Sequence, residues 1–173
     1  MSKTFSKESI LPLVDHGHTD FGENKVQEAE DKWTEIKLNK KYLQLHMIGK
    51  LQTNKVKQAV KIFDYIHSLD STKLAKKISE EQKKIEKKLK IFIQINIGNE
   101  SQKSGILINE LDQFYNMCIK NFDLNIIGLM CLPPAEIDPE ECLSQKAGLC
   151  PFEDESGGLK MQRKARVNYP TSS

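Results

Sequence analysis

Residues 91–97, which read Ile-Phe-Ile-Gln-Ile-Asn-Ile, predict the clearest strand of the chain. The isoleucines alternate with Phe92, Gln94 and Asn96, so one face is apolar and the other becomes polar towards the carboxyl end. A parallel strand covered on both sides would be apolar on both faces. We therefore expect the polar face to point to a ligand site, because such sites lie at the carboxyl ends of parallel strands. The alternative is a poorly covered edge of the sheet.

The neighbouring segments extend this pattern in both directions. Residues 42–48 alternate in the same way, with Gln44 and His46 on the polar side, and further strands are expected near 20–24, 65–68 and 124–130. Between them, helical spacing predicts helices over 7–16, from about 26 to 36, 54–62, 71–88 and through 111–117. Ser6 and Ser71 are expected to cap two of these helices, and Gly17 to end the first. Strands that alternate with such helices indicate parallel βαβ units and an α/β fold.

Composition excludes several classes of protein. The 26 lysines and arginines nearly balance the 24 acidic residues, which is not typical of a nucleic-acid-binding domain. No apolar run approaches the roughly 20 residues of a membrane span, and the first residues do not resemble a secretory signal, so we expect a cytoplasmic protein. The four cysteines are too widely spaced to indicate a zinc site or a disulfide framework. At 173 residues the chain is shorter than a complete β/α barrel of about 250 residues.

The character of the sequence changes after Pro133-Pro134. Five of the six prolines lie from Pro133 onward, and both arginines of the chain, Arg163 and Arg166, follow it. Residues 135–173 show neither a strand nor a helix period, and we interpret them as loop or disorder. The sequence therefore predicts a β/α region over 1–134 and a separate tail over 135–173.

Short segments that follow one another along residues 1–134 carry a family resemblance. They are Ser2-Lys3-Thr4, residues 21–29 (FGENKVQEA), residues 46–55 (HMIGKLQTNK), His67-Ser68-Leu69-Asp70, residues 94–97 (QINI), residues 102–105 (QKSG) and Gly128-Leu129-Met130. In this order they resemble the pyridoxal phosphate homeostasis protein family, also called proline synthase co-transcribed protein homologues. The members are single-domain relatives of the alanine racemase N-terminal barrel.

The resemblance implies a (β/α)8 barrel of the TIM type that binds pyridoxal 5'-phosphate, here as a partial barrel with strands two to six and a remnant of strand one. It implies that Lys3 holds the cofactor as an imine, because an imine requires a neutral amine and a lysine in a barrel mouth can have a lowered pKa. The implied role is homeostasis of the cofactor in a monomer, without an established turnover, a catalytic residue, a metal or a nucleic-acid or membrane partner. The expected cofactor-binding residues are Lys3, Asn24, His46, Ser68, Asn96 and Met130.

Two departures from the family pattern lead to a further expectation. The family has a helix and most of a strand before its Ser-Lys-Thr segment, whereas here the segment Ser2-Lys3-Thr4 follows Met1 directly. The family's phosphate-binding segments on the last two strands, one like Ser-Met-Gly-Met-Ser and one with Arg-Ile-Gly, have no counterpart in residues 135–173. We therefore expect a fragment that is truncated at both ends, with an unrelated tail after about Glu141 and impaired cofactor binding.

Other interpretations of the same residues stay open at this point. The chain could be a racemase-like enzyme that uses the same cofactor. The lysine-rich segment Lys73–Lys90 could bind a polyanion, although such a helix is more often the solvated outside of a barrel. Asn54 and Ser104-Gly105 are as consistent with helix starts as with ligand contacts, and His16 and His18 are better explained by capping and loop roles than by a metal.

Overall fold

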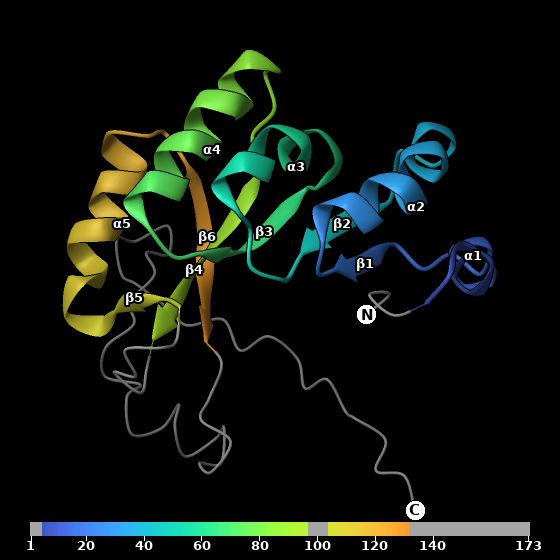
Figure 1. Cartoon of the computed structure of the whole chain (residues 1–173), viewed down its shortest axis with the longest axis horizontal. Helices are drawn as coiled ribbons and strands as arrows, with labels where there is room; N and C mark the ends of the chain where they lie inside the picture. The colour runs from blue at the N-terminus through green and yellow to red at the C-terminus, as the bar shows by residue number, and fades with distance from the viewer. Residues whose placement is uncertain (1–4, 97–103, 132–173) are drawn as a thin grey trace, which may run out of the picture. The chain divides into compact units, whose positions relative to one another are not determined.

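Strands and helices alternate along residues 5–96 and 104–131, which are the residues that the computed structural model describes. These residues lie in one unit, Met1–Ala135. The elements, shown in Figure 1, are α1 (Lys7–Asp15), β1 (Asp20–Glu23), α2 (Val26–Asn39), β2 (Gln44–Met47), the 3-10 turn η1 (Thr53–Lys55), α3 (Val56–Ile62), β3 (Tyr65–Leu69), α4 (Thr72–Lys84), β4 (Lys90–Asn96), β5 (Ile106–Leu107), the 3-10 turn η2 (Ile108–Glu110), α5 (Leu111–Lys120) and β6 (Asn125–Cys131).

All the strand pairs of this sheet are parallel, and their order is β1-β2-β3-β4-β6. The short β5 also pairs with β4, at Ile95 and Asn96. Ile95 is already paired with Cys131 of β6, so β5 must lie on the other side of β4, where β3 has ended. Along the described residues β1 and β6 do not pair, so these strands form a partial barrel that is not closed. This confirms the expected fold class.

One face of the sheet packs on the helices. The ring centroids of Phe21 in β1 and Trp33 in α2 are 4.6 Å apart, which identifies the side that faces the helices. Phe21 is in register with Leu45, and Ile66 is in register with both Met47 and Ile91, so these residues share that side. All are buried, as predicted for the apolar face. We call the opposite side of the sheet the inner face.

Most helix boundaries follow local sequence signals. Ser6 occupies the N-cap position of α1 as expected, but its hydroxyl makes no capping hydrogen bond and lies 3.2 Å from the Ser9 hydroxyl. Gly17 has a φ of 91°, the left-handed conformation expected at the end of α1, and the Ser71 hydroxyl accepts a hydrogen bond from the Leu74 amide at 3.4 Å. The prediction that α4 continues to Lys88 is wrong. The helix ends at Lys84, because Glu86 takes a φ of 53° that no helix can accommodate. No helix within the described ranges is long and apolar enough to cross a membrane.

The remaining expectations about organisation concern residues outside those that the structure describes. The remnant of the first strand at Ser2-Lys3-Thr4 and the tail over 135–173 both belong to this group. A short strand that the sequence did not predict, β5, precedes α5.

Candidate functional site

The register of the sheet places polar residues together on the inner face. Paired residues of parallel strands point to the same side, and His46 is paired with Gly22 of β1 and Tyr65 of β3. On β4, Phe92 and Gln94 are paired with Gly128 and Met130 of β6. His46, Gln94 and Met130 therefore share this face, and Asn96 lies two residues beyond Gln94 on the same side.

The structure locates five of the six predicted cofactor-binding residues. Asn24 directly follows β1 and is half-buried, and Met130 is also half-buried. Asn96 is buried with 7% of its surface exposed. Ser68 is 1% exposed and lies where the pairing of β3 with β4 shifts by one residue, and its hydroxyl has no hydrogen-bond partner within the described part of the chain. Lys3 lies outside the described residues.

His46 is held by its neighbours on both sides. Its Nε2 lies 3.0 Å from Oδ1 of Asp20, and its Nδ1 lies 3.0 Å from Nε2 of His67. The ring also stacks on Tyr65, with the centroids 4.1 Å apart and the planes at 9°. Both ring nitrogens are therefore engaged with protein groups, so His46 contributes to this face as a fixed ring and not as a hydrogen-bonding group for a ligand.

Gln94 and Asn96 are not at a poorly covered edge. Gln94 is 9% exposed, and its side-chain amide donates to the carbonyl oxygen of Ser104 at 2.9 Å. The Ser104 hydroxyl accepts a hydrogen bond of 2.7 Å from Nζ of Lys50. Hydrogen bonds therefore connect Ser104, just before β5, both to β4 and to the loop after β2. Ser104 and Gly105 lead into β5 and do not open a helix directly, which corrects that interpretation.

A cleft of about 530 Å³ lies at the carboxyl ends of β2 and β3. Among the described residues that line it, Lys50 and Asp70 are charged, and Thr53, Ser71 and Ser104 carry hydroxyl groups. None of the five predicted residues that the structure describes lines it. A signal was nevertheless present in the sequence, because these residues belong to or adjoin segments 46–55, 67–70 and 102–105, which the resemblance singled out.

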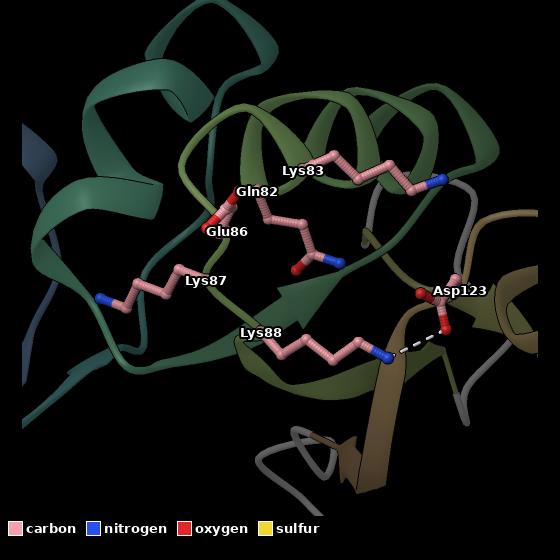
Figure 2. A pocket seen from close by; sticks show the side chains of 6 residues that line it. All are labelled: Gln82, Lys83, Glu86, Lys87, Lys88 and Asp123. Carbon is pink, nitrogen blue, oxygen red and sulfur yellow. Dashed lines mark hydrogen bonds and ion pairs between the residues drawn. The ribbon is translucent and has the colours of Figure 1, made fainter.

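A second hollow, of about 250 Å³, lies near the start of β4, and Figure 2 shows its lining residues Gln82, Lys83, Glu86, Lys87, Lys88 and Asp123. Nζ of Lys88 lies 3.1 Å from a carboxylate oxygen of Asp123. The Lys87 side chain turns to Asp64 at 3.3 Å and to the Phe63 carbonyl at 2.7 Å, and burial lowers its pKa. Two lysines of this hollow are thus paired with carboxylates, which argues against a site for a polyanion.

Metal and thiol chemistry find no support in the described part of the chain. It contains no group of three or more histidine, cysteine or acidic residues that could hold a metal ion. His16 caps the end of α1, and the His18 ring meets the Phe21 ring edge-on at 5.4 Å, so both have the capping and loop roles expected. Burial raises the pKa of the Cys118 thiol to about 12, so this thiol is not a nucleophile near neutral pH.

Comparison with known proteins gives consistent results. The family model of the alanine racemase N-terminal domain matches residues 7–166, beyond Pro134. The pyridoxal phosphate homeostasis protein of Escherichia coli (strain K12) is 36% identical over 137 residues, which is 79% of this chain and 58% of that protein. The protein of that name from Aquifex aeolicus is 33% identical over 170 residues, covering 98% of this chain and 71% of the relative. The chain thus spans little more than half the length of the Escherichia coli relative.

Solved structures show the same fold. PipY of Synechococcus elongatus without pyridoxal phosphate superposes with a TM-score of 0.76 at 30% identity, covering 86% of this chain and 68% of PipY. PipY with pyridoxal phosphate bound gives a TM-score of 0.73 at the same identity and coverage. Alanine racemase of Clostridium difficile has a TM-score of 0.60 at 18% identity over 82% of this chain and 36% of the racemase, which shows a shared fold alone.

Proposed function

The chain belongs to the pyridoxal phosphate homeostasis proteins of the alanine racemase N-terminal domain family, and from this premise we propose that it binds pyridoxal 5'-phosphate and serves its homeostasis. The observation that carries the proposal is the likeness to PipY, whose fold this chain shares and which has been solved with pyridoxal phosphate bound. The polar inner face at the carboxyl ends of the strands is where a parallel β/α sheet binds its ligands.

The described residues fit the ring side of such a cofactor. The buried Ser68 hydroxyl has no partner in the described ranges, and a polar ligand group is one way to satisfy it. The Asn24 and Asn96 amides can donate and accept hydrogen bonds, and the Met130 thioether suits contact with an aromatic ring.

The roles we assign are as follows. Lys3 bonds to the cofactor, whose aldehyde supplies the reactivity toward amines. Asn24, Ser68 and Asn96 orient the ring by hydrogen bonds, while Met130 packs against it. His46 acts through its position, since Asp20 and His67 occupy both of its ring nitrogens.

The test is to titrate the protein with pyridoxal phosphate, follow the visible absorption band, reduce with borohydride and map the adduct by mass spectrometry. We expect the adduct on Lys3 and its loss in Lys3→Ala. The control Lys57→Ala, at an exposed lysine of α3, should bind as the unchanged protein does. Adducts scattered over surface lysines, equally abundant in both variants, would refute the proposal.

A further inference from the structure

Two of the predicted cofactor-binding residues, Asn24 after β1 and Asn96 at the end of β4, each lie against a glycine. A Cβ atom on Gly49, in the loop after β2, would lie 2.8 Å from Cα of Asn24 and 2.9 Å from its carbonyl carbon. A Cβ atom on Gly105, just before β5, would lie 2.6 Å from the Asn96 nitrogen. These neighbours are backbone atoms, so a side chain at either glycine would displace the backbone that carries the asparagine.

Polar contacts connect the two glycine segments to each other. Nζ of Lys50 donates to the Ser104 hydroxyl at 2.7 Å, so residues that are 54 positions apart in the sequence meet here. Each segment is also anchored to a strand. The Ile48 amide donates to the Glu23 carbonyl oxygen at 2.9 Å, and the Gln94 side chain donates to the Ser104 carbonyl oxygen, also at 2.9 Å. A continuous path of contacts therefore runs from the end of β1 to the end of β4. We call the four residues that complete this path the edge bridge: Gly49, Lys50, Ser104 and Gly105.

The edge bridge spans the carboxyl ends of two strands. In the sheet, β2 and β3 separate β1 from β4, and three of the four bridge residues line the cleft at the carboxyl ends of β2 and β3. Within the described part of the chain β1 and β6 do not pair, so closure of the sheet does not fix the distance between Asn24 and Asn96. Contacts across the carboxyl edge are a direct way to hold two side chains that belong to unpaired strands.

We propose that the edge bridge positions Asn24 and Asn96 for the cofactor. The two glycines set the backbone of each asparagine, and the hydrogen bond between Lys50 and Ser104 holds one asparagine relative to the other. This inference rests on the proposed function, in which both amides orient the ring. A ligand binds more tightly when its partners are already in place, because less ordering is needed on binding. The bridge residues thus act through the asparagines and are positioning residues.

The variants Lys50→Met and Ser104→Ala test the bridge, since each removes one partner of the hydrogen bond and leaves both glycines in place. The dissociation constant for pyridoxal phosphate, measured by titrating the visible absorption band, should rise about fivefold in each, as expected for the loss of one hydrogen bond. The double variant should bind no more weakly than either single variant, because both changes remove the same bond. The control Lys57→Met, at an exposed lysine of α3, should bind as the unchanged protein does. A loss confined to Lys50→Met would mean that this lysine contacts the ligand directly, and it would overturn the inference, as would additive losses.

A second measurement needs no cofactor, so it separates failure of the bridge from failure of the proposed function. The side-chain amide signals of Asn24 and Asn96 are followed in nitrogen–proton correlation spectra of the full chain, and each variant is observed at the far end of the bridge. Ser104→Ala should shift the Asn24 signal and Lys50→Met the Asn96 signal, whereas Lys57→Met should shift neither. Unmoved far-end signals would refute the bridge even if the unchanged protein binds pyridoxal phosphate. Shifted signals in a protein that binds no pyridoxal phosphate would contradict the proposed function, while the positioning of the two amides would stand.

Discussion

Gly105 lies at a close approach of two chain segments near the candidate site. Its φ of 140° is a conformation that residues with a side chain rarely adopt. A Cβ atom there would lie 2.6 Å from the Asn96 backbone nitrogen and 2.7 Å from the Ile95 carbonyl carbon. Both neighbours are backbone atoms of β4, so they cannot turn aside as a flexible side chain could. Glycine at this position therefore allows β5 to pair beside Asn96.

The first prediction compares two glycines of positive φ. Gly105→Ala combines a strained φ with a backbone collision and should lower the free energy of unfolding by about 3 kcal/mol. Gly17→Ala is the control, because its φ of 91° is also strained but nothing lies within 4 Å of the added methyl group. We expect Gly17→Ala to lower the free energy of unfolding by only about 1 kcal/mol. Urea unfolding measures both, and equal losses would show that the contact with β4 contributes nothing.

At the scale of the element, α4 shows how a lysine-rich helix accommodates a buried acid. Glu81 is 4% exposed, and its Oε1 lies 2.7 Å from Nζ of Lys77 and 2.8 Å from Nζ of Lys84. Hydrogen bonds from these two lysines lower the pKa of Glu81 to about 2. The buried apolar stripe of the helix, which includes Leu74 and Ile78, faces the core. The lysines around Glu81 thus stabilise the helix by pairing.

The second prediction concerns the acid limb of the stability curve. A carboxylate whose pKa is lowered in the folded state stabilises that state at pH values above its ordinary pKa of 4.5. This contribution disappears as the pH falls from 4.5 towards about 2. The difference in unfolding free energy between the unchanged protein and Glu81→Gln should therefore shrink over that interval. Glu80→Gln, at an exposed neighbour, is the control with the same change of charge. A difference for Glu81→Gln that stays constant with pH would contradict the pairing.

At the scale of the whole molecule, Asp64 connects successive βα units. Its carboxylate accepts hydrogen bonds from Lys37 of α2 and, at 2.8 Å, from the Leu45 amide of β2, and Lys87 lies 3.3 Å away. Burial acts to raise the pKa of Asp64, but the hydrogen bonds and the two lysine charges outweigh it and lower the pKa. One side chain just before β3 thereby joins segments that lie far apart in the sequence.

The third prediction tests this connection. Asp64→Asn should lower the unfolding free energy by about 2 kcal/mol near neutral pH, since it removes charge-assisted hydrogen bonds from a half-buried site. Because the folded-state pKa is lowered, the loss should diminish as the pH falls below the ordinary aspartate value of 3.8. Asp123→Asn is the control, as its pair with Lys88 is 65% exposed on both sides. Chemical unfolding at several pH values measures both, and an equal effect of the two variants would contradict the role of Asp64.

The sequence by itself determined the fold class and the position of the longer elements. The alternation around Gln94 and the helical spacing of Val26, Ala29 and Trp33 each report which side of an element is buried, and that periodicity is a local property of the chain. It also predicted that Gln94, Asn96 and His46 belong to a polar face. Membership of the family followed from short segments at strand ends.

Only the tertiary structure decided how these residues are used. β5 is two residues long and has no period to detect, and its place depends on Gly105 meeting the backbone of β4. His46 contacts Asp20, which lies 26 positions before it in the sequence, and His67, which lies 21 positions after it. Local pattern carries no information about such contacts, because they depend on the register of three strands that only the folded sheet brings together.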